Sequence, residues 1–233
     1  MATEAGAPGR RKLLLSWSSG KDSAWALHRL RRAGEFEVVG LVTTVNRRFE
    51  RVAMHAVREA LVDLQAASAG LPLWKVPIPH PCSDACYQKA MADLLERARS
   101  AGVDAMAFGD LFLEEIRRYR EKRLEGQEVE PVFPLWGLPT AELAREMVDA
   151  GLGARITCID PKLLPRHFAC REFDSALLDE LPAGVDPCGE HGEFHTFAHR
   201  GPMFRTPIVV KPGEIVERDG FVFADLLPEG GRC

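Results

Sequence analysis

Residues 13–27 constrain the fold of this 233-residue chain more than any other stretch. The apolar run Leu13-Leu14-Leu15 meets a short polar turn, which leads directly into a pattern of helical periodicity. This order predicts a strand, a loop and a helix, with Lys21 at the helix entrance. The first amides of a helix have no partner inside it and carry partial positive charge. We therefore predict a site for a phosphate or pyrophosphate group here.

The side chains of this loop add to the same chemistry. Lys21 brings a full positive charge, and the carboxylate of Asp22 suits a metal ion or a water molecule. An ordinary strand–helix turn with a solvated lysine is the alternative interpretation. The residues predicted to hold the phosphates are Ser18, Ser19, Gly20, Lys21, Asp22 and Ser23.

The loop does not match the common P-loop, which requires Gly, four residues and then Gly-Lys-Ser/Thr. Leu15 stands in place of the first glycine, and Asp22 follows the lysine. The segment instead resembles the SGGKDS signature of the PP-loop ATP pyrophosphatases, with Ser19 in place of its first glycine. That resemblance implies that the loop holds the pyrophosphate released when ATP is split between its α and β phosphates. Ser19 must then accept a backbone conformation that glycine adopts freely.

Composition is that of a globular protein, with 46% apolar and 27% charged residues. The net charge of -4 argues against a general nucleic-acid or anionic-membrane binder. Apolar runs fall short of the roughly 18 residues that a membrane helix needs. The six cysteines are scattered and do not resemble a disulfide framework. We therefore expect a cytoplasmic protein with reduced thiols.

Residues 12–130 alternate between strand and helix patterns, after a tail at 1–11 that we expect to be disordered. The alternation predicts an α/β fold, an open parallel sheet covered by helices. Strands are expected at Leu13–Leu15, Phe36–Val45, Leu71–Val76 and Asp104–Phe108. Helices are expected from the loop to Gly34, at Val52–Ala67, from Ser83 or Asp84 to Ala101, and at Glu114–Glu125.

Residues 131–233 are expected to form a smaller α+β domain that packs closely on the first, with a cleft between them. Thr140 is predicted to cap a helix ending at Ala150, and a second helix is expected at Glu172–Leu181. Turns are predicted at Pro212-Gly213 and Asp219-Gly220. The expected strands are Ala154–Ile159, Glu193–His199, Ile208–Lys211, Glu214–Arg218 and Phe221–Asp225.

Two further polar segments follow predicted strands of the first sheet. Open parallel sheets bind ligands at the carboxyl ends of their strands. Thr43 and Thr44 are therefore candidates for the adenine of ATP. Gly109 permits close approach of the backbone to ribose or phosphate, and Asp110 suits Mg²⁺. A plain turn after the strand is the alternative for Gly109-Asp110.

The stretch from Asp186 to Thr196 is the second segment that a simple turn does not explain. Glu190 and Glu193 lie three residues apart among glycines and histidines, so two carboxylates could surround one cation or ammonium ion. An exposed hairpin with solvated charges is the alternative interpretation.

With both segments in view, the chain resembles the diphthine–ammonia ligase family, the N-type ATP pyrophosphatases of the HUP superfamily. The family's second signature, EGGEYET, corresponds to Glu190–Thr196, where His191 replaces a glycine. The resemblance also includes the region of His55, Phe108-Gly109-Asp110, the helix containing Arg118, and Pro134-Leu135-Trp136. It extends from about Lys12 to about Asp225. The abundance of Ala, Arg and Gly would also suit a bacterial relative of the family.

The resemblance implies a HUP-type nucleotide-binding domain at 12–130 and a substrate domain at 131–233. It implies that ATP activates a carboxylate, that pyrophosphate leaves, and that ammonia attacks the acyl adenylate to give an amide and AMP. In the named family the substrate is diphthine on elongation factor 2. The implied cofactors are ATP and Mg²⁺, and a homodimer is compatible with the sequence.

Roles for individual residues follow from the same resemblance. Lys21, Asp22, Glu190 and Glu193 are the implied catalytic residues, and Asp22 or Asp110 would hold magnesium. His55 would lie near the nucleotide, or be an ordinary helix histidine. The implied substrate-binding residues are Arg118, Gly189, Glu190, Gly192, Glu193 and Thr196, with a solvated arginine as the alternative for Arg118.

Two other functions fit part of the sequence. PP-loop tRNA-modifying enzymes can use paired cysteines, and Cys82 and Cys86 lie four residues apart, but the acidic balance disfavours tRNA. A non-catalytic ATP sensor would explain the first loop and leave Glu190 and Glu193 without a role.

Overall fold

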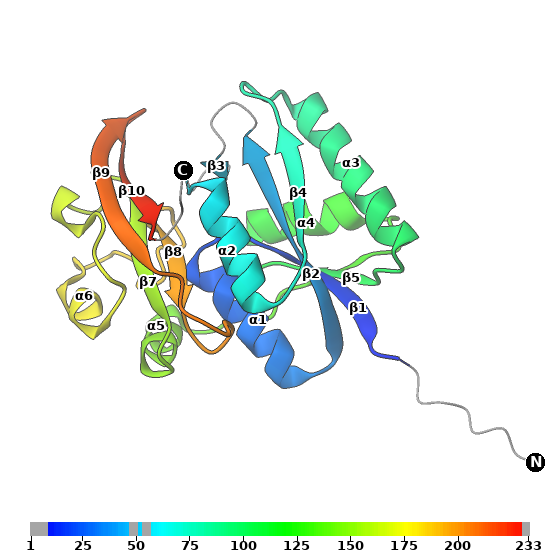
Figure 1. The fold of residues 1–233 in the computed structure, drawn as a ribbon, viewed down its shortest axis with the longest axis horizontal. Coiled ribbons are helices and arrows are strands. Elements are labelled where there is room, and N and C mark those ends of the chain that lie inside the picture. The colour runs from blue at the N-terminus through cyan, green and yellow to red at the C-terminus, as the bar shows by residue number, and fades with distance from the viewer. Residues whose placement is uncertain (1–8, 47–50, 53–56, 230–233) are drawn as a thin grey trace, which may run out of the picture.

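A computed structural model describes residues 9–46, 51–52 and 57–229. Two sheets lie side by side in it (Figure 1). The larger sheet has six strands, in the order β3-β2-β1-β5-β6, with β4 pairing on β2. Its strands are β1 (Arg11–Ser16), β2 (Phe36–Asn46), β3 (Arg51–Val52), β4 (Leu73–Ile78), β5 (Ala105–Ala107) and β6 (Glu130–Val132).

All pairs of this sheet are parallel except the short β2–β3 pair. Helices cover both of its faces, so the predicted α/β fold with an open parallel sheet is confirmed. The predicted domain boundary after residue 130 falls inside β6. The helices of this part are α1 (Lys21–Ala33), α2 (Glu59–Ala69), α3 (Asp84–Ser100) and α4 (Glu114–Leu124).

The alternation of side chains along β1 explains the two layers. Leu13 and Leu15 pack with apolar residues of α1 and α2, whereas Leu14 points to the opposite face and joins α3 and α4. All three leucines are at most 1% exposed, and each such burial contributes about 1.5–3 kcal/mol. A continuous apolar run is typical of a parallel strand that is covered on both sides.

Most predicted helices of the first part form within a few residues of their expected bounds. The helix after the loop ends at Gly34, whose φ of 68° suits a glycine C-cap. Ser83 caps α3 by accepting from the Cys86 N–H. The helix predicted at Val52–Ala67 was placed too early, because Val52 belongs to β3 and α2 begins only at Glu59.

The second sheet is antiparallel, in the order β8-β7-β10-β9. Its apolar residues and those of α5 form one continuous core with the α1/α2 face of the first sheet. This confirms the expected smaller α+β part, which lies beside the first sheet (Figure 1). The elements are α5 (Thr140–Asp149), β7 (Gly153–Ile159), a 3-10 turn at Arg166–Phe168, α6 (Ser175–Glu180), β8 (Phe194–Arg200), β9 (Val210–Arg218) and β10 (Phe221–Pro228).

Three local predictions in this part were wrong. Pro212-Gly213 is not a turn but lies within β9, where Pro212 pairs with Leu226 of β10 next to a register shift between Ala224 and Leu226. Thr140 is the first helical residue and Pro139 precedes it, because the Thr140 hydroxyl donates to the Asp186 carboxylate instead of capping. The helix predicted at Glu172–Leu181 starts only at Ser175, with Asp174 as its cap. Asp219-Gly220 does form the predicted tight turn, with φ of 53° and 82°.

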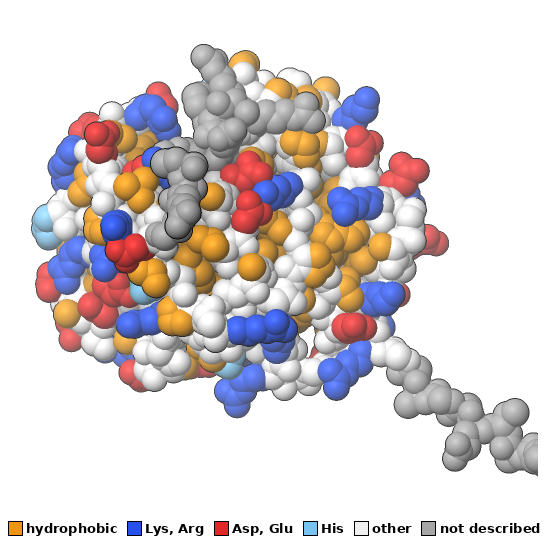
Figure 2. All heavy atoms as spheres, viewed as in Figure 1, with side chains coloured by type: hydrophobic (Ala, Val, Ile, Leu, Met, Phe, Trp, Pro, Cys, Tyr) orange, Lys and Arg blue, Asp and Glu red, His pale blue; other side chains and the backbone are white. Residues whose placement is uncertain are grey.

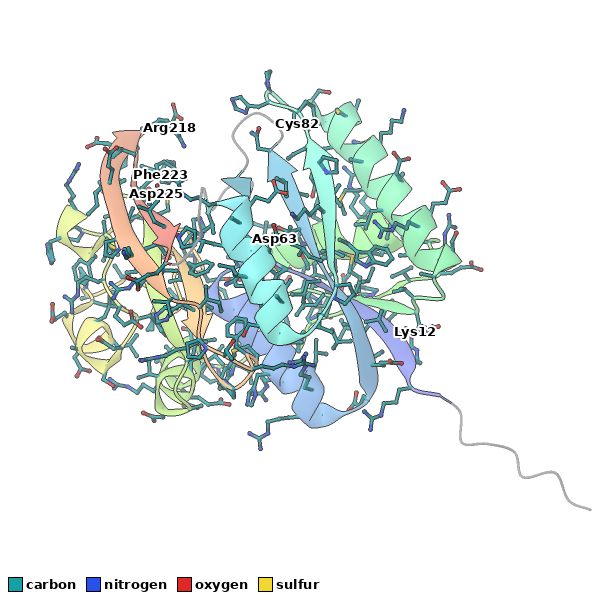
Figure 3. The ribbon with its side chains drawn as sticks, in the orientation of Figure 1. Lys12, Asp63, Cys82, Arg218, Phe223 and Asp225 are labelled. Carbon is teal, nitrogen blue, oxygen red and sulfur yellow. The ribbon has the colours of Figure 1, made fainter. Side chains whose placement is uncertain are left out.

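An ion pair links the two parts at their outer side. Asp225 lies on β10 (Figure 3), and its carboxylate is 2.5 Å from the guanidinium of Arg58, the residue before α2. None of the helices in the described residues is long and apolar enough to cross a bilayer. On the face in Figure 2, acidic and basic side chains are interspersed, unlike the one-sided basic surface that nucleic-acid binding favours.

Candidate active site

A cleft of about 350 Å³ lies at the carboxyl end of β1, where the two parts meet. That volume lies in the range of small-molecule sites. Its walls come from the loop before α1, from the segment after β5, from α4, and from the loop before β8. The predicted residues that line it are Ser18, Gly20, Lys21, Asp22, Ser23, Gly109, Asp110, Gly189, Glu190, Gly192 and Thr196.

The first loop has the shape of an anion cradle. Gly20 occupies the N-cap of α1, and its N–H donates to the hydroxyl of Ser18. The Ser23 hydroxyl lies 3.2 Å from that of Ser18 and donates to the Gly20 carbonyl. Two hydroxyls and a helix N-terminus therefore converge on one corner of the cleft, as phosphate binding requires.

Ser19 differs from its neighbours, because it is fully buried and does not line the cleft. Its φ is 73°, in the left-handed region that favours glycine, where a serine costs on the order of 1 kcal/mol. Its carbonyl accepts from Ala198 of β8 and from the side chain of Gln65 on α2. Ser19 thus anchors the loop to both parts of the molecule, and its buried hydroxyl has no hydrogen-bond partner among the described residues.

Lys21 is 1% exposed and held by charges from both parts. Its Nζ lies 2.9 Å from both carboxylate oxygens of Asp22 and also donates to the carbonyl of Cys188. The rings of Phe173 and Phe194 lie 5.6 and 5.4 Å away. Burial, the largest single effect, lowers the pKa of Lys21, but the attraction of Asp22, Cys188 and Glu190 together outweighs it and the net shift is upward. The ammonium therefore stays charged at neutral pH.

Thr196 joins the second signature to the first. Its hydroxyl oxygen accepts from the Lys21 N–H at 3.0 Å, across 175 residues of sequence. A side chain at Gly20 would come within 3.3 Å of the Thr196 carbonyl, so glycine permits this contact. The two predicted motifs therefore form one site.

The segment after β5 closes the floor of the cleft. Gly109 lies against the first turn of α1, because a Cβ there would come within 3.1 Å of the Asp22 and Ser23 backbone. Gly109 thus permits contact between two protein segments, and it also lines the cleft in which a ligand contact was predicted. Burial raises the pKa of the Asp110 carboxyl, and the guanidinium of Arg120 at 3.5 Å opposes that shift.

Glu190 and Glu193 have different surroundings. Glu190 lines the cleft and accepts from the Leu111 N–H at 2.8 Å. Burial raises the pKa of Glu190 to about 7, with a smaller upward effect of Asp22. Glu193 is 3% exposed and does not line the cleft; one oxygen accepts from the Asp186 N–H, while the other is buried without a partner among the described residues.

Several residues that the sequence predicted for the site do not line this cleft. Arg118 lies on α4 with its side chain 76% exposed, paired with Glu114, so the cleft does not contain it. Thr43 and Thr44 lie within β2 and do not line the cleft either. His55 is outside the described residues.

Arg120 is a charged cleft residue that the sequence interpretation missed. Leu113 is the N-cap of α4, and Ile116 and Arg120 follow at helical spacing on the same face; all three line the cleft. That spacing was a usable signal for Arg120 in place of Arg118. His195 also lines the cleft, and burial lowers the pKa of His195 to about 4. Burial raises the pKa of the Cys188 thiol to about 12, which agrees with a packing role.

The donor set fits ATP and suits Mg²⁺ only together with phosphate. Asp22, Asp110 and Glu190 are hard oxygen donors around one cleft. Among the described residues, however, no group of three or more acidic, histidine or cysteine side chains is arranged to hold a metal. Mg²⁺ is often bound by one or two carboxylates plus substrate phosphates, and Asp22 and Asp110 suit that arrangement.

The sheet order, the loop at the end of β1 and the cleft together define a nucleotide-binding α/β protein of the HUP, PP-loop type. Residues 11–127 match the diphthamide synthase N-terminal domain, and residues 139–224 match the diphthamide synthase C-terminal domain. The chain therefore belongs to the diphthamide synthase family, as its two signatures predicted.

Curated relatives carry the corresponding enzyme name. The zebrafish (Danio rerio) diphthine–ammonia ligase is 27% identical over 89% of this chain and 89% of its own length. The human (Homo sapiens) diphthine–ammonia ligase is 27% identical over 76% of this chain and 70% of its own. The cattle (Bos taurus) enzyme of that name is 25% identical over the same shares. The family is thus one of ligases that form C–N bonds.

Proposed function

We propose that this chain is an ATP-dependent amide-forming ligase, which adenylates a carboxylate and then transfers ammonia to it. The observation that carries the proposal is the placement of Glu190, a carboxylate with a pKa of about 7, in the same cleft as Lys21 and the phosphate-binding loop. In this division of roles, residues 12–130 bind ATP and residues 131–233 supply the loop that faces ammonia. The free cysteines of the described chain suit the cytoplasm.

In the first step, a carboxylate oxygen of the acid attacks the α-phosphorus of ATP and the bond to the β-phosphate oxygen breaks. Negative charge grows on the departing pyrophosphate. Lys21 and the N-terminus of α1 stabilise that charge, and a preorganised charge of this kind is worth about 10²–10³ in rate. Asp22 or Asp110 would hold Mg²⁺ together with the phosphates, and the ion would supply further neutralisation of the negative charge there. To reach a phosphate, Lys21 exchanges its bond to the Cys188 carbonyl for one to the nucleotide.

In the second step, ammonia attacks the acyl carbon and AMP leaves. Ammonium must lose a proton before it attacks, and a base with a pKa near 7 is suited to accept it. Glu190 takes this role in the proposal. The unpartnered oxygen of Glu193 is a buried acceptor that an ammonium ion would satisfy, so Glu193 both holds the loop through Asp186 and attracts ammonium.

The test is product analysis with ATP, Mg²⁺, ¹⁵N-ammonium and a panel of carboxylic acids that includes diphthine-containing protein. The expected result is AMP, pyrophosphate and a ¹⁵N-amide in equal amounts. ATP binding without AMP from the whole panel would favour a sensor. Glu193→Ala should raise the KM for ammonium, with Glu142→Ala on the exposed part of α5 as the matched control. Full ammonia-dependent turnover in Glu193→Ala would refute the role of Glu193.

A further inference from the structure

A second cavity, of about 500 Å³, lies between α3 and α4 on the face of the parallel sheet away from α1 and α2. We call it the α3/α4 groove. Buried apolar side chains of the sheet and of both helices form its floor, so it presents an apolar bed to a ligand. The apolar residues that line it include Met91, Leu95, Met106, Phe108 and Leu124.

The charged side chains of the groove are all of one sign. Lys89, Arg120 and Arg123 line it, and none of its described lining residues is acidic. Tyr87 and Tyr119 add phenol groups to the same walls. An apolar bed with a basic rim is complementary to an anion that carries an apolar body, and it repels a cation of the same shape.

The groove and the nucleotide cleft share two residues, Phe108 and Arg120. The guanidinium of Arg120 lies 4.9 Å from the centre of the Phe108 ring, and its Nε lies 3.5 Å from Asp110 at the floor of the cleft. Arg120 also interacts with the Tyr87 phenol. It therefore stands at the boundary between the two cavities, and its long ion pair with Asp110 leaves it able to bind a second carboxylate.

We propose that the α3/α4 groove binds the carboxylic acid that this enzyme activates, an acid whose apolar body lies on Met91, Leu95 and Met106 and whose carboxylate meets Arg120. The proposal rests on the proposed function, because the acid at Arg120 then lies beside the site where ATP is bound. It assigns the substrate class, an acid with an aliphatic or aromatic body.

Binding can be measured without turnover, by calorimetry on the full chain with butyrate, hexanoate, octanoate and 4-phenylbutyrate. Affinity should rise about fourfold for each buried methylene along the aliphatic series. Octyltrimethylammonium, with the same body and the opposite charge, should bind at least about tenfold more weakly than octanoate. Arg120→Gln should weaken octanoate while leaving octan-1-ol unchanged.

Ala92→Trp fills the groove from an exposed position of α3, and Ala101→Trp places the same side chain after the end of that helix, outside the groove. Octanoate binding should fall at least about tenfold in Ala92→Trp and stay unchanged in Ala101→Trp, with ATP binding kept in both. Acids that do not bind, or that bind Ala92→Trp as well as the parent chain, would overturn the proposal.

The two proposals fail differently. If an acid gives AMP and Ala92→Trp does not change the turnover of that acid, the groove proposal is refuted and the ligase proposal stands. If Ala92→Trp weakens octanoate binding but no acid of the panel gives AMP, the groove stands as a carboxylate site and the ligase proposal is refuted.

Discussion

The two loops that form the cleft are built in different ways. The loop at 18–23 joins β1 to α1, and the hydroxyls of Ser18 and Ser23 bond within the loop. Its backbone also bonds to Gln65, Thr196 and Ala198, which are distant in the sequence. The loop at 186–196 is held by its own carboxylates. Asp186 accepts from the N–H groups of Cys188 and Glu190 and from the Thr140 hydroxyl, and its own N–H donates to Glu193.

The difference between the two loops also separates acidic residues that hold a loop from acidic residues that face the cleft. In the first loop, a strand that enters a helix brings the backbone amides to the cleft, and Thr196 of the second loop holds the Lys21 N–H. In the second loop, Asp186 and one oxygen of Glu193 accept bonds that hold the loop, whereas Glu190 lines the cleft. The other oxygen of Glu193 is buried without a partner among the described residues. This comparison can be tested with substitutions that preserve both loops and remove one functional group from each loop.

The largest effect is expected for Lys21→Met. Loss of the charge near the leaving pyrophosphate should lower the rate of AMP formation by about 10²–10³. Because Asp22 loses its partner, thermal stability should be measured alongside. Lys122→Met on the exposed part of α4 is the control. A rate within a few-fold of the parent chain would show that the first loop does not hold the leaving group.

Glu190→Gln should lower ammonia-dependent turnover by about 10²–10⁴. At saturating ammonium the parent rate should rise with pH through about 7, as Glu190 becomes ionised, and the variant should lack that rise. A profile with the same inflection in Glu190→Gln would assign the titration to another group.

Stability gives an independent check on Glu190. Its folded pKa lies above its ordinary value, so the folded state binds the proton more tightly than the unfolded state. This contribution is fully present below about pH 4.5 and is lost as pH rises through 7. Glu190→Gln should therefore be more stable than the parent at pH 8, by on the order of 1–3 kcal/mol, and near the parent at pH 4. Chemical denaturation at both pH values measures the difference.

Substitutions of Arg118 and Arg120, both on α4, should differ in their effect on the KM for the acid. Arg120→Gln should raise the KM for the acid about tenfold, because Arg120 lines both cavities. Arg118→Gln should change it by less than about twofold, because a surface pair such as Arg118–Glu114 contributes little. A larger effect at Arg118 would restore the role that the sequence first suggested for it.

The smallest effect is expected for Ser19→Gly. Glycine relieves the positive φ and removes an unpartnered buried hydroxyl, while the carbonyl that anchors Ala198 and Gln65 remains. The free energy of unfolding should rise by up to about 1 kcal/mol, with ATP affinity unchanged. Weaker ATP binding would mean that the Ser19 hydroxyl contacts the nucleotide.

Much of the fold follows from local patterns. Leu13, Leu14 and Leu15 are apolar on both faces of a strand, so a covered parallel sheet was predictable. Gly34 and Ser83 ended and began helices as capping rules require. The start of α2 was not predicted, because a valine at position 52 fits an apolar helical pattern although the backbone there pairs with Val45 of β2.

The sequence by itself determined the strand–loop–helix unit, the helix-covered parallel sheet and the two signatures, because short-range periodicity and composition encode them. Only the tertiary structure decided that Thr196 meets the Lys21 N–H, that Glu190 and not Glu193 lines the cleft, and that Arg120 and not Arg118 faces it. Those outcomes depend on how two sheets pack on one continuous core. Burial then sets the pKa of Glu190, which no local pattern specifies.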